Sequence, residues 1–281
     1  MAQTLMLSRP IIRWLTRQRP PPPIPLSNFE RLCQELKPCD VVLVEGRSRA
    51  SAVVKTVTQS PWCHAALYVG RLYDIEDPEG RRLVREATDL PASERLVIES
   101  MLGEGCVVRP LSVYEDDHVR LCRPQGLSHP DAQQVLMHAA QQIGKGYDLR
   151  QIFDLLRFLL PWALMPRRWR SSLFRQLPGK QTRTVCSTMI AEAFGAVQFP
   201  ILPLVQQGEG DELRLFRRNP KLCVPSDFDY SPYFQIIKYP FMDFSAHTGY
   251  RLLPWSSRTP AATLPNNSTA ALGPPNEDQP P

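Results

Sequence analysis

The chain has 281 residues, 43% of them hydrophobic, and carries a net charge of +5. This length suffices for one sizeable domain with appendages, and the charge is too small to indicate a nucleic-acid partner. Its seven cysteines include no CxxC pair, and their odd number favours a reducing compartment over a disulfide framework. Composition thus excludes a small disulfide-stapled protein, and we expect a cytoplasmic one.

The first 25 residues divide into a leader and a linker. Residues 1–18 intersperse apolar side chains such as Trp14 with arginines, which would suit a short basic amphipathic helix on an anionic membrane surface. The alternative is a terminus that is frayed or docks on the core. Those arginines also interrupt any secretory signal. Residues 19–25 (RPPPPIP) predict a stiff spacer, so we place the globular domain at 26–253 and a disordered tail at 254–281.

Hydrophobic patterning predicts a helix at 29–36 followed by several short strands. The expected strands are 41–44, a segment opening at His64, 95–101, a segment opening at Val107, and 119–123. Between them we expect a turn at 46–48, a polar segment before His64, and a surface hairpin or insertion at 73–91. Short strands joined by tight turns indicate a mostly antiparallel sheet.

The second half of the domain is expected to be more helical. Ser128 is positioned to cap a helix that stops near Gly144, and another helix begins near Cys186. An apolar helical stretch at 152–165 contains Pro161, which should kink or end it. Further on, we expect a turn at 227–230 and a strand at 233–237.

A basic and apolar insertion at 149–180 precedes the Cys186 helix. From 148 to 180 there are seven basic residues against two acids, which indicates a local anionic partner. Arg167, Arg168 and Arg170, with Trp162 and Trp169 beside them, suit a surface that meets acyl chains and phosphate head groups. The alternative is that this stretch is ordinary core.

Cys186 is the candidate nucleophile. A thiol attacks efficiently only when its pKa is lowered, which a helix N-terminus and a neighbouring imidazolium can do. Cys186 falls in the first turn of its expected helix, where Thr182 and Thr184 can act as caps. His64 opens its strand and could supply the imidazole, although a lone histidine is also often a core residue bonded to a carbonyl.

Glu99 is the leading candidate for a third group that orients the imidazole. On the expected strand at 95–101 it shares a face with Val97 and Met101, where a carboxylate is costly unless it is paired. If that strand neighbours the strand of His64, the two side chains would lie together. The alternative for Glu99 is a strand-edge carboxylate that faces water.

Four segments together resemble a known family. The runs DVVLVEGRSRASAVVKTVTQSPWCHAALYVG, VIESMLGEGCVVRPLSVYE, GKGYD and VCSTMIAEAF are similar to the permuted papain-like cysteine amidases, the YaeF/YiiX group of the NlpC superfamily. The likeness covers residues 38–195. It implies an α+β fold, with an antiparallel sheet or half-barrel packed against helices. It also implies a cysteine nucleophile (Cys186), a histidine general base and acid (His64) and an orienting Glu99.

The resemblance implies a thiol hydrolase of amide or peptide bonds that needs no metal or other cofactor. One alternative is a lipid acyl hydrolase or acyltransferase at a membrane surface, like the lecithin:retinol acyltransferase-like enzymes, which would make the protein peripheral on the membrane. Another is a binding module without catalysis.

Three further residues are candidates on the substrate side. Tyr147, followed by Asp148, matches the family's tyrosine-containing segment before the cysteine. Ser48 and Ser60 lie in the hydroxyl-rich segment before His64. Ser48 is not part of a GxSxG nucleophile elbow, and it serves either as a turn hydroxyl or as a substrate-side donor.

Overall fold

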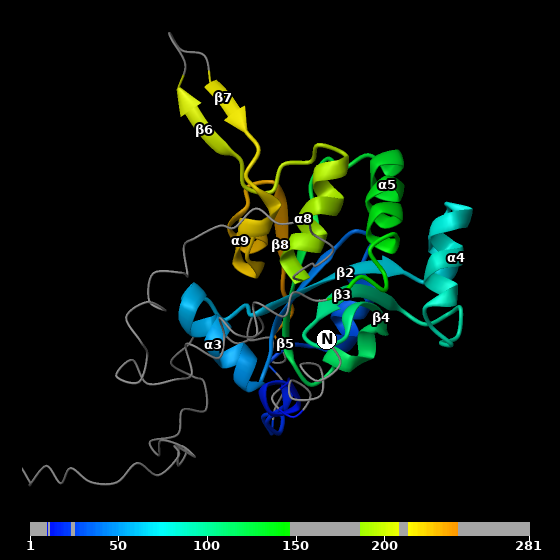
Figure 1. Ribbon diagram of the computed structural model, residues 1–281, viewed down its shortest axis with the longest axis vertical. Helices are drawn as coiled ribbons and strands as arrows, with labels where there is room; N and C mark the ends of the chain where they lie inside the picture. Colours follow the sequence, from blue (N-terminus) through cyan, green and yellow to red (C-terminus); the bar gives the residue numbers. More distant parts are fainter. Residues whose placement is uncertain (1–9, 11, 24–25, 147–185, 208–212, 241–281) are drawn as a thin grey trace, which may run out of the picture. The chain divides into compact units, whose positions relative to one another are not determined.

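Six strands form one sheet in the computed structural model, which describes residues 10, 12–23, 26–146, 186–207 and 213–240. They are β1 (Val41–Glu45), β2 (His64–Gly70), β3 (Leu96–Met101), β4 (Gly105–Pro110), β5 (His118–Pro124) and β8 (Phe234–Ile237). The order across the sheet is β4-β3-β2-β1-β5-β8, and every neighbouring pair is antiparallel. Two short strands, β6 (Leu204–Gln207) and β7 (Leu213–Phe216), form a separate hairpin (Figure 1).

Helices surround the sheet. They are α2 (Phe29–Glu35), α3 (Arg49–Thr58), α4 (Pro78–Glu86), α5 (His129–Ala140), α8 (Cys186–Ala196) and α9 (Pro225–Tyr230). Short 3₁₀ turns occur at η1 (Leu72–Asp74), η2 (Leu111–Tyr114) and η5 (Pro220–Leu222). Local chemistry sets several helix starts: Asn28, Ser48, Asp77 and Ser128 each accept a backbone N–H with their side chains as N-caps.

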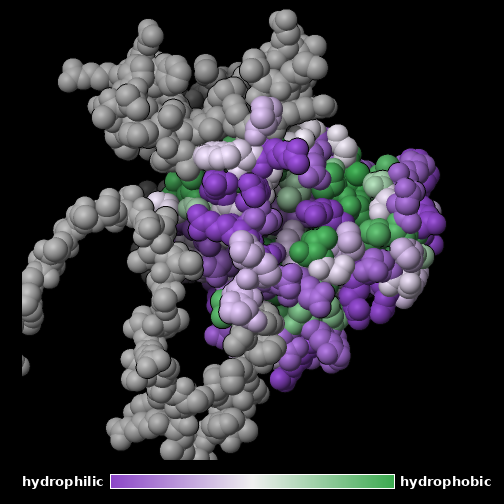
Figure 2. All heavy atoms as spheres, turned by 90° about the horizontal axis from the view of Figure 1, so that it is seen from below, coloured by the Kyte–Doolittle hydropathy of each residue, from purple (hydrophilic) through white to green (hydrophobic). Residues whose placement is uncertain are grey.

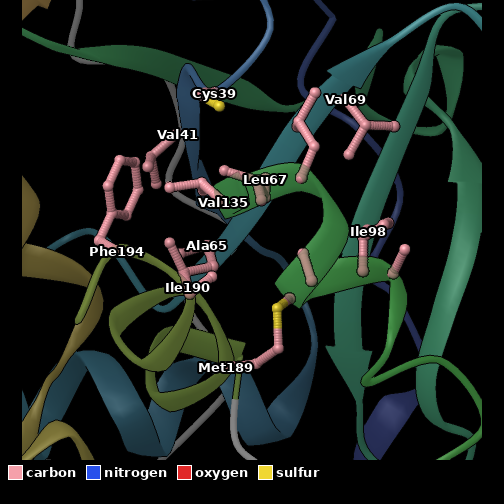
Figure 3. Close-up of a cluster of buried hydrophobic side chains, with 14 of the residues drawn as sticks. Cys39, Val41, Ala65, Leu67, Val69, Ile98, Val135, Met189, Ile190 and Phe194 are labelled. Carbon is pink, nitrogen blue, oxygen red and sulfur yellow. The ribbon is translucent and has the colours of Figure 1, made fainter. Parts of the chain in front are cut away.

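The central strand β2 separates two apolar clusters. Because side chains alternate along a strand, Ala65 and Leu67 enter one cluster, whereas Ala66 and Tyr68 enter the other. The first cluster also receives the apolar faces of α5 and α8, and Figure 3 shows Met189 and Ile190 of α8 among its members. This packing fixes α8 against β2 and β3.

The surface is mixed in character. On the face shown in Figure 2, hydrophilic residues dominate and smaller hydrophobic patches lie among them. Within the described ranges, no helix combines the length and the apolar character required to cross a bilayer.

The α+β class and the antiparallel sheet confirm the sequence prediction, but three segments differ from it. The polar segment before His64 is helix α3, started by the Ser48 cap. In the segment expected to be a hairpin, Asp77 and Pro78 instead begin helix α4, because Asp is a good N-cap and Pro suits the first helical position. The turn expected at 227–230 lies inside α9, which begins at Pro225.

The described part of the leader docks on the domain. Residues 12–16 are helical, and Leu15 is fully buried. Arg49 donates to the Trp14 carbonyl at 3.3 Å, and its guanidinium lies over the Trp14 ring. For these residues the structure agrees with the docked-terminus alternative. The insertion at 149–180 and the tail at 254–281 lie outside the described residues.

Candidate active site

His64 and Glu99 lie side by side on β2 and β3. The strands pair with Leu67 opposite Ile98 and Tyr68 opposite Val97, so the same register brings Glu99 close to the start of β2. The Nε2 atom of His64 is hydrogen-bonded to the Oε2 atom of Glu99. The expectation that the two strands are neighbours is therefore confirmed, and Glu99 is paired rather than exposed.

Glu99 is fully buried and held from three sides. Besides its bond to His64, it accepts a hydrogen bond from the Tyr114 hydroxyl at Oε2, and Arg109 Nη1 lies 3.6 Å from Oε1. Burial acts to raise the pKa of Glu99, but these partners outweigh it and lower the pKa. Glu99 is therefore ionised at neutral pH.

Cys186 is the first residue of α8 and is almost completely buried. Its sulfur is hydrogen-bonded to His64 and accepts the backbone N–H groups of Ala65 and Ser187. Burial acts to raise the pKa of the thiol, but the His64 charge and these hydrogen bonds outweigh it and lower the pKa. The helix N-terminus favours the same charged form.

The imidazole of His64 completes the arrangement. Burial acts to lower its pKa, whereas Cys186 and Glu99 raise it well above the usual histidine value. Since the thiol pKa falls while the imidazole pKa rises, the favoured state is a thiolate–imidazolium pair. Three groups that are far apart in the sequence thus form one buried, hydrogen-bonded chain.

Two of these partners, Tyr114 and Arg109, were not predicted. Arg109 follows Val107, which pairs with Glu99, by two positions on β4, and so shares its face. An arginine on an otherwise apolar strand was the signal for it. Tyr114 comes from the η2 turn after β4, and no periodicity could have placed its hydroxyl.

The predicted substrate-side residues have local partners. Ser48 caps α3 by accepting the Ser51 N–H, and its hydroxyl lies 2.8 Å from that of Ser51. Ser60 accepts the Trp62 N–H at 3.2 Å. The other predicted residues lie outside the described part of the chain: Tyr147, Asp148, Trp162, Arg167, Arg168, Trp169, Arg170, Thr182 and Thr184.

The described residues offer no metal centre. Within these ranges, no group of three or more His, Cys, Asp or Glu side chains could hold a metal ion. All seven cysteines are free thiols. The hydrogen-bonded arrangement of Cys186, His64 and Glu99 has the groups that nucleophilic attack by sulfur with proton transfer through an imidazole requires.

Comparisons with known proteins give a likeness to solved structures but no family. No family model matches the chain, and no curated protein matches it. Among solved structures, the chain is similar to the metalloprotein YiiX from Escherichia coli O157:H7, DUF1105. The TM-score is 0.42 at 14% sequence identity, and the match covers 72% of this chain and 97% of that one.

Proposed function

We propose that the protein is a cysteine hydrolase with a permuted papain-like arrangement, acting on amide or peptide bonds through Cys186, His64 and Glu99. One observation carries the proposal: a thiol at a helix N-terminus is hydrogen-bonded to an imidazole that a buried carboxylate holds on its other side. Nucleophile, base and orienting group are the three parts that such catalysis requires.

In the first half of the reaction the Cys186 thiolate attacks the carbonyl carbon. A carbon–sulfur bond forms, and the carbonyl electrons move to oxygen. The tetrahedral intermediate then collapses and breaks the carbon–nitrogen bond, while His64 gives its proton to the departing amine. The product is an acyl-thioester on Cys186 and a free amine.

In the second half, water replaces the thiol. His64, now neutral, takes a proton from water, and the hydroxide attacks the thioester carbonyl. The carbon–sulfur bond breaks, the carboxylic acid leaves, and the thiolate–imidazolium pair returns. Esters follow the same path with an alcohol as leaving group, so the chemistry also serves the lipid alternative.

The surrounding groups support these steps. The backbone N–H of Cys186 lies in the first turn of α8, where amides lack intrahelical acceptors, and supplies a donor for the oxyanion. Glu99 fixes the ring of His64 and stabilises its charged form, while Tyr114 and Arg109 keep Glu99 ionised in its buried position.

Selective alkylation tests the proposal. Wild-type protein and a Cys186→Ala variant are treated with iodoacetamide at mildly acidic pH, and the adducts are mapped by mass spectrometry. Cys186 should be labelled first, and Cys186→Ala should lose this adduct together with hydrolysis of p-nitroanilide and p-nitrophenyl substrates. Cys33→Ala is the matched control, because Cys33 is a partly exposed thiol outside the site, and it should retain both.

Two results would contradict this function. Equal labelling of Cys186 and Cys33 would show that the thiol is not activated, and the binding-module alternative would then be favoured. Hydrolysis that survives in Cys186→Ala would show that another group performs the chemistry.

A further inference from the structure

The strands β2 and β3 part at the end of the sheet where Cys186 lies. Their ladder starts with Leu67 opposite Ile98, three residues into β2. Before that point the Cys186 sulfur lies beside β2, since it accepts the N–H of Ala65 and is hydrogen-bonded to His64. Because α8 packs against β2 and β3, the way to the sulfur lies at this end of the strands, which we call the open end.

The ends of three adjacent strands meet at the open end. In the antiparallel register, Val44 of β1 lies opposite His64 of β2. Continuing the β2–β3 register outward from Leu67 and Ile98 brings Met101, the last residue of β3, level with His64. Since β2 lies between β1 and β3, a segment that runs from the end of β3 to the end of β1 has to cross in front of His64.

The leader is such a segment. Near β3, its Ile12 packs on the β3–β4 turn, where a Cβ atom built on Gly103 would lie 2.7 Å from the Ile12 Cγ2 atom. Past the end of β1, its Gln18 forms an antiparallel bridge with Ser48. Ile12 and Gln18 are six residues apart, and most of this stretch is helical, which gives a span of about 9 Å. Two strand spacings are about 10 Å, so the leader is just long enough to cross β2.

The leader turns an apolar face inward and a basic face outward. Leu15 is fully buried, and Ile12, three positions earlier on the same helix face, is partly buried. Arg13, Trp14 and Arg17 are exposed. The leader is therefore held across the open end by packing of one face, as a docked element rather than a loose tail.

The polar contacts of the leader lie at the surface. Arg49 donates to the Trp14 carbonyl at 3.3 Å, and Arg47 donates from Nη1 to the carbonyl of Arg19 at 3.1 Å. The N–H of Arg19 reaches the Arg47 carbonyl at 3.4 Å. Water competes for such bonds, so undocking of the leader is a local opening of low free energy that leaves the sheet folded.

We propose that the docked leader is an autoinhibitory strap that closes the open end until it undocks. The inference concerns the regulation of the candidate site and rests on the proposed cysteine hydrolase function. Cys186 is 7% exposed, and the side chain of His64 is 18% exposed. A substrate has to bring its carbonyl to the sulfur and its leaving group to the imidazole, so a covering segment has to move first. Activity then scales with the undocked fraction of the protein.

Leu15→Gln is the variant that undocks the leader, because a buried amide without a partner destabilises the docked state. Arg17→Gln places the same side chain on the exposed face and is the matched control. The full-length proteins are labelled with biotin-maleimide, a bulky reagent, and with the smaller iodoacetamide, and the adducts are mapped by mass spectrometry. Cys33, a partly exposed thiol outside the site, is the internal reference.

Relative to Cys33, labelling of Cys186 by biotin-maleimide should rise about tenfold in Leu15→Gln and stay within about twofold in Arg17→Gln. The gain with iodoacetamide should be smaller, because a small reagent needs less opening. The pH at which labelling is half-maximal should not move, since access changes and the ion pair with His64 does not. The kcat/KM for p-nitroanilide substrates should increase by the same factor as the bulky labelling.

Arg49→Ala is a second variant, which leaves the buried leucine in place. It removes the bond to the Trp14 carbonyl and the contact with its ring, so bulky labelling of Cys186 should rise about twofold to threefold. Circular dichroism and urea unfolding show whether each variant keeps its sheet.

The outcomes separate the strap from the proposed function. Faster bulky labelling of Cys186 in Leu15→Gln and Arg49→Ala, without any hydrolysis, would support the strap and contradict only the hydrolase function. Bulky labelling that is unchanged in both folded variants, or that rises equally in Arg17→Gln, would overturn the strap. Hydrolysis that is lost in Cys186→Ala would then leave the hydrolase function standing.

Discussion

Cys186 and Cys122 are both buried thiols, but their surroundings move their pKa values in opposite directions. At Cys122, in the middle of β5, burial raises the pKa, and the nearby carboxylate of Asp229 adds to the rise. At Cys186, burial acts the same way but is outweighed by His64 and two backbone N–H donors. Burial therefore makes a thiol inert unless positive charge and hydrogen-bond donors accompany it.

The difference follows from the elements that carry the two residues. Cys122 lies on a strand whose amides are paired with neighbouring strands. Cys186 begins a helix, where the N–H of Ser187 is free to reach the sulfur, and the N–H of Ala65 reaches it from β2. Cys106 on β4 repeats the strand case, because burial raises its pKa to about 12. The lowered pKa of Cys186 thus follows from its position at a helix start beside His64 rather than from exposure.

Replacing His64 should abolish the contrast between the two thiols. In His64→Ala the thiol of Cys186 keeps its burial but loses the opposing charge, so its pKa should rise and hydrolysis should fall by about 10⁴-fold or more. His129→Ala is the matched control, since this exposed histidine also pairs with a carboxylate, Glu76, and it should keep full activity. Unchanged hydrolysis in His64→Ala would remove the imidazole from the mechanism.

The pH profile of alkylation gives the sign of the same effect. The pKa of Cys186 is lowered from the ordinary value of 9.0. The thiolate therefore contributes stability above pH 9.0, and this contribution is lost as the pH falls through the lowered pKa. The raised pKa of His64 acts oppositely, and its contribution is lost as the pH rises through it. Iodoacetamide should therefore label wild-type Cys186 well below pH 9.0, and His64→Ala should lose this labelling. A profile that His64→Ala does not shift would contradict the ion pair.

Breaking the ion pair beside Cys122 should cost stability without changing reactivity. Arg123 holds the fully buried Asp40 through two hydrogen bonds, of 2.9 and 2.7 Å. Asp40→Ala leaves the guanidinium without its carboxylate partner and should lower the free energy of unfolding by about 3 to 5 kcal/mol. Urea unfolding measures this, and alkylation of Cys186 in the folded variant should follow the wild-type pH profile. A shifted profile would show that the two regions are coupled.

Tyr114→Phe should have an intermediate effect on stability and on the site formed by Cys186, His64 and Glu99. It removes one donor to the buried carboxylate of Glu99, so the pKa of Glu99 should rise and the free energy of unfolding should fall by about 1 to 3 kcal/mol. Urea unfolding gives the stability, and kcat tests the positioning role, because a purely structural hydroxyl would leave kcat unchanged. Tyr73→Phe, at an exposed tyrosine, is the control.

The smallest effect is expected at Ser48. Ser48→Ala removes the N-cap of α3 and should lower the free energy of unfolding by about 1 kcal/mol. Ser48→Asp keeps a capping group and should restore the stability. If kcat/KM falls in Ser48→Ala beyond what the stability explains, the hydroxyl also acts on the substrate side.

Local sequence patterns predict most of the strands and which side chains share a face of each strand. Period-two alternation puts His64 with Ala66 and Tyr68, and Glu99 with Val97, so two neighbouring strands suffice to join them. Apolar spacing likewise placed Cys186 at the start of a helix. These features depend on residues close together in sequence.

The rest depends on contacts between distant segments or on competing local signals. Helix α3 contains five β-branched residues, which argue against a helix, and only the cap at Ser48 and packing through Val53 favour it. The Tyr114 hydroxyl comes from the η2 turn, and the Cys223 carbonyl, which accepts the hydroxyl of Ser187 beside Cys186, comes from the segment after η5. No periodicity in the sequence describes either position. Sequence alone could not supply the approach of α8 to β2, because long-range packing determines it.

The order of the groups along the chain has a consequence for biosynthesis. Strands β1 to β5, with His64 and Glu99, leave the ribosome before α8 is made. If the proposed function holds, the thiolate of Cys186 forms only after α8 has been made and has packed against β2 beside His64. A chain that ends before residue 186 lacks the proposed nucleophile, so it should show no thiol chemistry at this site.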